Sequence, residues 1–195
     1  MSDPARIDDY EEKKLYTYKD YLKWDTRERF QLINGEVYSM ASPSVIHQAI
    51  QVELLTEFNN YLRGKPCRVF GSPLDVRLFP KKDRSDNTVV QPDLLVVCDK
   101  NKIDKGSING APDLVVEIIS PSNTFNELFL KYQLYLKAGV KEFWTIDIEK
   151  KLANINIYDN GYYNYTNYEK DDVVTVTIFN DLKISMKDLW ASLPE

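Results

Sequence analysis

One short run of residues constrains the fold of this chain more than any other. Leu114 to Ile119 is almost continuously apolar, yet it contains Glu117. Such a run is typical of a strand that is covered on both faces of a sheet. An ionised carboxylate within a buried strand costs free energy unless it is paired or binds a metal ion. The sequence therefore predicts a buried strand whose glutamate has a specific partner.

A second carboxylate, Asp93, stands at the start of the preceding apolar run, Leu94 to Cys98. Side chains alternate along a strand, so Asp113, Val115, Glu117 and Ile119 share one face. If the two strands are neighbours in one sheet, Asp93 and Glu117 project at one end of it. Two such oxygen ligands, completed by a backbone carbonyl and waters, commonly hold Mg²⁺. The alternative is a strand-end carboxylate beside a buried ion pair.

The segment that follows predicts a helix from about Thr124 to Ala138, ended by Gly139. Lys131 falls within the apolar stripe of this helix. The other residues of the stripe are Leu128, Tyr132, Tyr135 and Leu136. A lysine on the sheet-facing side of a helix needs a counter-charge, which Glu117 or Asp93 would supply. The alternative is a lysine whose stem covers the core while its ammonium reaches water.

The N-terminal half indicates a hairpin and a long helix. Residues 1–15 are polar, and we expect them to be flexible. Thr17 is suited to cap a short helix through Trp24. Asn34-Gly35 separates two short runs and is a strong signal for a β-hairpin. A helix is then predicted from Ser44 to about Leu62, with a buried face at helical spacing. That face consists of Ile46, Ile50, Leu54, Phe58 and Tyr61.

The remaining strands are expected from apolar or alternating runs between turn signals. They are Cys67 to Leu78, Val89 to Cys98, Glu142 to Asp147, a hairpin about Asn160-Gly161 and Val173 to Phe179. Pro80 to Thr88 is interpreted as a charged, solvated turn, and Lys100 to Gly110 as a hydrophilic loop. Ser120-Pro121-Ser122 is expected to break the buried strand, and Met186 to Ser192 to form a terminal helix.

These elements predict an α/β (α+β) fold with a mixed central β-sheet flanked by helices and with additional N- and C-terminal β-hairpins. The run from Leu114 to Asp147 fits a right-handed crossover between parallel strands. We expect residues 16–195 to form a single domain, preceded by the flexible segment 1–15.

Composition limits the partners and the cellular location that we expect for the protein. The 195 residues are 43% hydrophobic and carry a net charge of −5. That charge argues against non-specific coating of DNA, but bound Mg²⁺ offsets such a charge in a nuclease. Cys67 and Cys98 lack C-x-x-C spacing, so we expect neither a zinc site nor a disulfide framework. With no signal peptide and no apolar run of about 18–20 residues, the prediction is a soluble cytoplasmic protein without membrane contact.

Three further side chains are candidates for supporting roles. Asp75 lies two residues from Arg77, so the choice is between a salt bridge within the strand and support of the metal site. Glu36 follows the Asn-Gly turn. His47 is the only histidine, which excludes a metal cluster built from several histidines. It is either a hydrogen-bonded structural residue or a contact of the site or substrate.

Several motifs together resemble the Uma2 family of restriction-endonuclease-like proteins, within the PD-(D/E)XK nuclease superfamily. They are V-Q-P-D-L-L-V-V-C-D, G-A-P-D-L-V-V-E-I-I-S-P-S, K-x-x-x-Y-x-x-A-G-V-K-E-F-W and L-I-N-G-E-V-Y-S-M-A-S-P-S-x-x-H. The resemblance covers roughly residues 16 to 190. It implies a restriction-endonuclease-like core in which Asp93, Glu117 and the Ile118 carbonyl bind Mg²⁺ or Mn²⁺.

One position departs from the motif, because its lysine would stand where this chain has Ile119. In nuclease-like relatives the lysine can move to the following helix, and Lys131 is the matching candidate. The resemblance thus implies a DNA endonuclease, active as a homodimer, in which Lys131 orients a metal-activated water or stabilises transition-state charge. The alternatives are an inactive binding or assembly module with a nuclease fold, or a nuclease acting on RNA or branched DNA.

Overall fold

The computed structural model describes residues 14–26, 28–119 and 125–194. The elements, in chain order, are α1 (Tyr18–Tyr21), β1 (Phe30–Ile33), β2 (Glu36–Ser39), α2 (Val45–Leu62), β3 (Arg68–Gly71), β4 (Asp75–Arg77), β5 (Val89–Val90), β6 (Leu94–Val97), the 3-10 helix η2 (Lys100–Lys102), β7 (Ser107–Asn109), β8 (Leu114–Ile119), α3 (Phe125–Ala138), β9 (Glu142–Asp147), β10 (Leu152–Asp159), β11 (Tyr162–Tyr168), β12 (Val173–Thr175), β13 (Lys183–Ser185) and α4 (Met186–Ala191).

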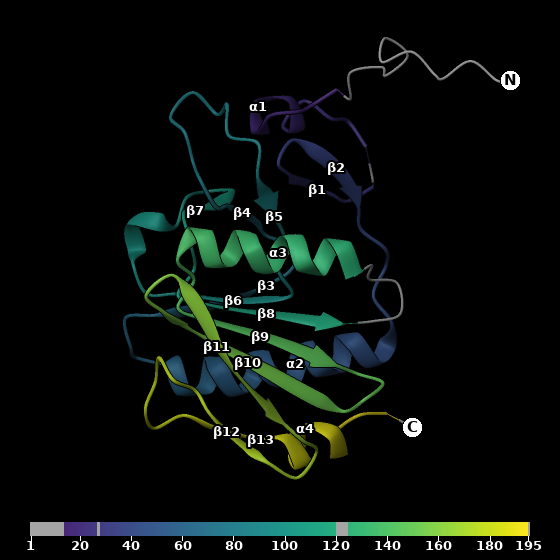
Figure 1. Ribbon diagram of the computed structural model, residues 1–195, viewed down its shortest axis with the longest axis vertical. Helices are drawn as coiled ribbons and strands as arrows, with labels where there is room; N and C mark the ends of the chain where they lie inside the picture. The colour runs from purple at the N-terminus through teal and green to yellow at the C-terminus, as the bar shows by residue number, and fades with distance from the viewer. Residues whose placement is uncertain (1–13, 27, 120–124, 195) are drawn as a thin grey trace, which may run out of the picture.

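The described strands form a six-stranded sheet, a five-stranded sheet and a two-stranded pair (Figure 1). The six-stranded sheet has the order β11-β10-β9-β8-β6-β3, and β8 runs parallel to β9 while its other pairs are antiparallel. Helices α2 and α3 lie on opposite faces of this sheet. The predicted mixed sheet flanked by helices is therefore confirmed, as is the parallel crossover from β8 through α3 to β9.

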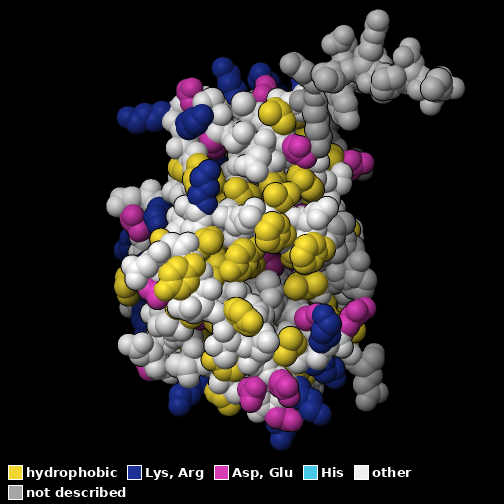
Figure 2. Space-filling view, in the orientation of Figure 1, with side chains coloured by type: hydrophobic (Ala, Val, Ile, Leu, Met, Phe, Trp, Pro, Cys, Tyr) yellow, Lys and Arg dark blue, Asp and Glu magenta, His cyan; other side chains and the backbone are white. Residues whose placement is uncertain are grey.

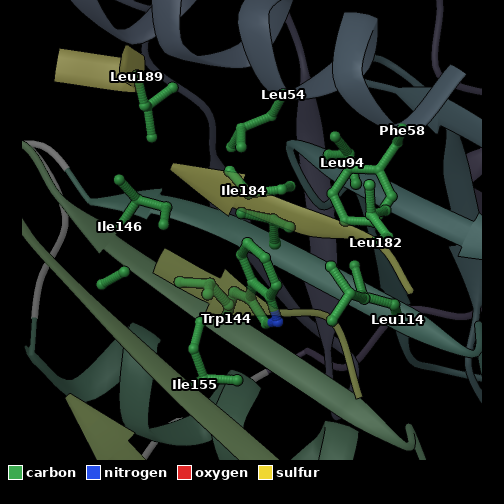
Figure 3. Packing of buried hydrophobic residues seen from close by; sticks show 14 of the residues in the cluster. Leu54, Phe58, Leu94, Leu114, Trp144, Ile146, Ile155, Leu182, Ile184 and Leu189 are labelled. Atoms are coloured by element: carbon green, nitrogen blue, oxygen red, sulfur yellow. The ribbon is translucent and has the colours of Figure 1, made fainter. Parts of the chain in front are cut away.

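Alternation along the central strands divides the core between the two faces of the six-stranded sheet. Leu94, Val96, Leu114 and Val116 pack toward α2, together with the cluster in Figure 3 that includes Trp144. The intervening Leu95, Val97 and Val115 face α3 and contact its Leu134 and Tyr135. All of these positions are fully or almost fully buried. The near-continuous apolar sequence of β6 and β8 follows from burial on both faces.

Both predicted hairpins are present. β1 pairs with β2 around Asn34-Gly35, and β10 pairs with β11 around Asn160-Gly161. The φ angles at the two turns are 54° and 87° in the first and 47° and 98° in the second. Asparagine and glycine tolerate these positive values, which a two-residue type I′ turn requires.

The long helix α2 begins as predicted, because the Ser44 side chain accepts a hydrogen bond from the His47 amide. Ile50, Leu54 and Phe58 are buried, as expected, but Ile46 is 38% exposed. His47 and Gln51 occupy the buried face in its place. Helix α1 ends at Tyr21, earlier than predicted, although Thr17 caps it.

Two segments that we expected to be single strands are each divided between the two sheets. Cys67 to Leu78 forms β3 in the six-stranded sheet and β4 in the five-stranded one, with a cis Ser72-Pro73 bond between them. Val89 to Cys98 forms β5 and β6 in the same two sheets. The single-strand predictions were therefore wrong. The two segments cross from one sheet to the other side by side, since β3 pairs with β6 and β4 with β5.

One other region contains more regular structure than expected, and another contains less. The predicted loop Lys100 to Gly110 holds η2 and β7, and β7 pairs in parallel with β4. The predicted strand Val173 to Phe179 ends at Thr175, where it pairs with the unpredicted β13. These pairings join residues distant in sequence, which local patterning does not reveal.

Cys67 and Cys98 form a disulfide, so the expectation of unpaired cysteines was wrong. The cysteines lie 31 positions apart in sequence, but Arg68 is opposite Val97 in the β3–β6 ladder. That register brings the residues just beyond the two strands together. Sheet pairing therefore creates a bond that cysteine spacing alone did not indicate.

A salt bridge between Arg77 and Asp75 was one of the two alternatives for this strand, and Arg77 does not form it. Its guanidinium donates to Asp86 at 2.9 and 2.5 Å, and both side chains are buried. The prediction that the turn through Asp86 is solvated fails at that residue, which is 2% exposed. The turn folds back because the buried guanidinium needs a counter-charge.

Hydrophobic side chains gather at the centre of the face shown in Figure 2, over α3 and the neighbouring strands. Phe125 and Phe129, 80% and 50% exposed, stack with 6.2 Å between ring centroids. They line a groove of about 250 Å³ together with Tyr132 and Phe143. In the Tyr-rich β11, Tyr163 is buried and Tyr165 is exposed.

Two predictions fall partly or wholly outside the described residues: the flexible segment 1–15 and the strand break at Ser120-Pro121-Ser122. No helix in the described part of the chain is long and apolar enough to cross a membrane.

Candidate active site

The predicted site residues meet where the two sheets adjoin. β6 and β8 are antiparallel neighbours with Leu94 opposite Val116, so Asp93 and Glu117 lie at the same end of the pair. In Figure 1 the C-terminal end of β8 lies on the same side of the molecule as the first turns of α2 and α3. Side chains from two strands and two helices thus have access to one small volume.

Glu117 projects toward α3 because its neighbours Val116 and Ile118 face α2. Its carboxylate is held by two side chains of that helix. Lys131 Nζ donates to Oε2 at 3.0 Å, and the Tyr135 hydroxyl donates to Oε1 at 2.5 Å. Lys131 is only 3% exposed, which excludes a lysine that reaches into water. The structure therefore joins Glu117 and Lys131 as the sequence predicts.

The electrostatics of this group reflect an excess of negative charge in a buried place. Burial raises the pKa of Glu117, and nearby Asp93 adds to the rise against the attraction of Lys131. Burial alone would lower the pKa of Lys131, but Glu117 and Asp93 outweigh it and raise the pKa. Burial, with Glu117 beside it, also raises the pKa of Tyr135, so that its hydroxyl stays a donor.

Asp93 is fixed through both its side chain and its backbone. Its Oδ2 accepts a hydrogen bond from the Ile118 amide at 2.8 Å, which ties the start of β6 to β8. Its backbone carbonyl accepts from Gln51 Nε2 at 2.7 Å and from the Ser72 amide at 3.1 Å. The other carboxylate oxygen, Oδ1, has no hydrogen-bond partner among the described residues, so it is available to a ligand.

His47 belongs to this arrangement, because its Nε2 lies 3.3 Å from Asp93 Oδ2. His47 and Gln51 are one helical turn apart on α2, and both contact Asp93. His47 Nδ1 is buried without a partner in the described part of the chain. The candidate role of His47 as a contact of the site is thus consistent with its position.

These side chains line a cavity of about 110 Å³. Asp93, Glu117, Ile118, Lys131 and His47 contribute to its wall, and so do Arg29, Gln31, Gln91 and Glu127. Water needs only about 10–15 Å³ by a comparable measure, so the cavity has room for several waters or a hydrated cation.

The remaining candidates lie outside the cavity. Asp75 accepts hydrogen bonds from Tyr21 at 3.1 Å and from Gln91 at 2.9 Å, so it supports a cavity residue rather than lining the cavity. Glu36, near Tyr38 in β2, is not among the cavity's described lining residues. Asp113, which precedes β8, has a structural role, since it accepts a hydrogen bond from the Cys98 amide and pairs with Lys141.

The donor chemistry fits a divalent cation at the Asp93–Glu117 pair. No cluster of three or more His, Cys, Asp or Glu side chains suited to a metal occurs among the described residues. Two carboxylates beside one ammonium nevertheless leave a formal negative excess; burial, and then the charge of Asp93, raise the pKa of Glu117. An ionised carboxylate has about four lone-pair sites. Glu117 therefore keeps acceptor capacity beyond its hydrogen bonds to Lys131 and Tyr135, and Asp93 Oδ1 accepts no hydrogen bond from the described residues.

Sequence reasoning missed several residues of the site, and three of them illustrate why. Tyr135 was assigned to the apolar stripe of α3, although its position one turn after Lys131 places its hydroxyl near the same carboxylate. Gln51 was an available signal, as a polar residue on the buried face of α2. Gln91 immediately precedes the Pro92-Asp93 pair, but only the β4–β5 pairing shows that Asp75 holds it.

Comparisons with known proteins show which proteins share this sequence and fold. The chain is 28% identical over 159 residues to a protein of Synechocystis sp. that is described as uncharacterized, which covers 79% of this chain and 80% of that protein. A crystal structure from Anabaena variabilis, titled as a "putative nuclease belonging to DUF820", has a TM-score of 0.75. That similarity covers 92% of this chain and 99% of the other at 24% identity, and it shows that the fold is shared.

A family model extends the comparison to sequence. It matches residues 18–187, a range that contains every site residue described above. The chain therefore belongs to the Uma2 family, whose description is "Putative restriction endonuclease".

Proposed function

We propose that this protein is an endonuclease that hydrolyses DNA phosphodiester bonds with the help of Mg²⁺ or Mn²⁺. The observation that carries the proposal is the buried Glu117–Lys131 ion pair with the half-buried Asp93 beside it, on the wall of a cavity. A structural ion pair alone would not require a second carboxylate beside it. Family membership supports the nuclease class, and the metal and the DNA substrate are our inference.

Asp93, Glu117 and the Ile118 carbonyl would hold the cation, which when bound supplies an acidified water and offsets phosphate charge. Lys131 is oriented by its bond to Glu117 and would place positive charge at the reacting phosphate. Arg29 also lines the cavity. Among the described residues its guanidinium makes one hydrogen bond, to the Ala41 carbonyl at 3.4 Å, which leaves other guanidinium donors for a phosphate oxygen.

Lys131 on α3 would take the role of the motif lysine, whose usual position is occupied here by Ile119. Because Lys131 already contacts Glu117, a lysine in the β8 position is not needed to bring an ammonium to the carboxylates. We further propose that the protein acts as a homodimer, since cutting both strands needs two sites. We also propose that it acts in the cytoplasm. The exposed Phe125–Phe129 stack is a candidate contact between copies.

The test is cleavage of supercoiled plasmid by purified protein with Mg²⁺, Mn²⁺ or EDTA. The wild type should nick or linearise DNA only with a divalent cation. Glu117→Gln and Asp93→Asn should each slow cleavage by about 100-fold or more, the scale expected when a preorganised charge is removed. Glu57→Gln, an exposed change on α2, should cleave normally.

Each failure has a distinct meaning. Cleavage that Glu117→Gln leaves intact, in a protein with an unchanged melting curve, would show a contaminating nuclease or another site. A wild type that cuts neither plasmid, branched DNA nor RNA would support the binding-module alternative. Preferential cutting of RNA or branched DNA would keep the site and change the substrate.

A further inference from the structure

Gln91 lines the cavity and has a buried oxygen without a hydrogen-bond partner in the described part of the chain. It is 6% exposed, and its Oε1 is buried without a hydrogen-bond partner among the described residues. An unpaired buried acceptor costs free energy, so native structures seldom leave one without a reason. Gln91 lines the cavity that contains Asp93 and Glu117.

The orientation of this amide is determined by its neighbours. Gln91 Nε2 donates to Asp75 Oδ1 at 2.9 Å and contacts the Tyr21 hydroxyl at 3.2 Å. A carboxylate accepts hydrogen bonds and cannot donate them when ionised. Asp75 therefore selects the amide nitrogen, and the amide oxygen is left without a hydrogen-bond partner among the described residues. The β4–β5 register, with Val76 opposite Val90, brings Asp75 opposite Gln91.

Gln31, on the neighbouring strand β1, repeats the arrangement. It is 2% exposed, its Nε2 donates to Glu127 Oε1 at 2.6 Å, and its Oε1 has no partner in the described part of the chain. It lines the same cavity. Each of two buried glutamines thus directs its nitrogen to a carboxylate and keeps its oxygen unpaired. The repetition indicates a shared ligand that accepts lone pairs from oxygen.

We propose that Gln91 and Gln31 provide neutral oxygen ligands to the divalent cation held by Asp93 and Glu117, and that Asp75 and Glu127 are positioning residues that orient the two amides. Side-chain carbonyl oxygens are ordinary ligands of hard cations. In this site the two amide oxygens add ligands without adding negative charge to a cavity that already has Asp93, Glu117 and Glu127 in its wall. The inference rests on the cation of the proposed function, but not on DNA cleavage.

Calorimetric titration with Mn²⁺ in the absence of DNA tests this inference. Gln91→Met keeps the length of the side chain and removes the oxygen, and Gln31→Met does the same on β1. Each should weaken Mn²⁺ binding at least about tenfold, the lower end of the loss seen when metal-site partners are removed. Gln133→Met, an exposed change on α3, is the matched control and should bind as the wild type does.

Asp75→Asn tests the positioning role separately. An asparagine can accept from or donate to Gln91, so the amide is no longer held in one orientation. Mn²⁺ binding should weaken several-fold although no cavity residue has changed. This variant and Gln31→Met keep the inference testable if Gln91→Met fails to fold, which a thermal melt would detect.

The inference is overturned if folded Gln91→Met and Gln31→Met bind Mn²⁺ as tightly as the wild type, or if the wild type binds no Mn²⁺. It is also overturned if the substitutions leave Mn²⁺ affinity intact and weaken DNA binding in EDTA, because the amides would then contact substrate. Weakened Mn²⁺ binding in a protein that cuts no nucleic acid supports the inference and rejects the proposed function. If the wild type cuts DNA but the glutamine variants bind Mn²⁺ as tightly as it does, the proposed function is supported and this inference is rejected.

Discussion

Replacing Lys131 by methionine tests the ion pair at the centre of the site. Nζ lies 3.0 Å from Glu117 Oε2, and both side chains are buried. Methionine preserves the apolar stem of lysine, so the substitution removes the charge with little change in packing. Breaking a buried ion pair by removing one partner costs about 3–5 kcal/mol.

The cost has an upper bound, because Glu117 can take up a proton rather than remain charged and unpaired. Protonating a carboxyl of ordinary pKa, about 4.3, costs about 1.36 kcal/mol for each pH unit above that value. The bound is then about 3.7 kcal/mol at pH 7 and about 1 kcal/mol at pH 5. Burial raises the pKa of Glu117 in the folded state, so folding favours proton uptake and the stability of the variant rises as pH falls.

Urea unfolding at pH 7 and pH 5, followed by tryptophan fluorescence in EDTA, measures this difference. Relative to wild type, Lys131→Met should lose about 3–4 kcal/mol at pH 7 and about 1 kcal/mol at pH 5. Combining it with Glu117→Gln should restore most of the loss, because the unpaired carboxyl is gone. Lys137→Met, an exposed change on the same helix, should cost less than about 1 kcal/mol. An equal loss at both pH values, or a loss below about 1 kcal/mol at pH 7, would refute the reasoning.

Three more predictions concern stability. Tyr135→Phe removes a 2.5 Å hydrogen bond to Glu117 and should cost about 1.5–3 kcal/mol in urea unfolding; an unchanged midpoint would contradict that bond. Burial alone would raise the pKa of Asp86, but hydrogen bonds from Arg77 and the Lys81 amide lower it. The ionised Asp86 should therefore stabilise the folded protein above about pH 3.9, and this stabilisation should be lost as pH falls below that value. Asp86→Asn should be less stable than wild type at neutral pH, and its stability should fall less than that of wild type on acidification. Cys67→Ser with Cys98→Ser opens a loop closed over 31 residues and should cost about 3–4 kcal/mol; a melting temperature insensitive to reductant in the wild type would refute that.

The sequence predicted the centre of the site because its signals are local and periodic. Glu117 interrupts an apolar strand, Lys131 interrupts an apolar helix face, and the crossover between them limits how the two elements pack. The hairpins were predicted for the same reason, since Asn-Gly specifies its own turn.

What the sequence did not predict depends on partners that are distant along the chain. Asp75 and Arg77 suggested a pair within one strand, but Arg77 finds Asp86 only when the charged turn folds back. The cysteines meet only through the β3–β6 register. Tyr135 was indistinguishable from a core residue, because a phenol contributes an apolar ring and its hydroxyl partner is set by the packing of α3 on β8.

The passage of one segment through both sheets has a consequence for how such a protein changes over evolution. Val89–Val90 is held by β1 and β4, and Leu94–Val97 by β3 and β8. The three residues between them belong to neither ladder, and they include Gln91 and Asp93. An altered length or sequence there would leave the register of both sheets intact while moving the carboxylate out of place. The candidate site and the sheet pairing thus depend on different residues in this segment, so a descendant could lose the site and keep the fold.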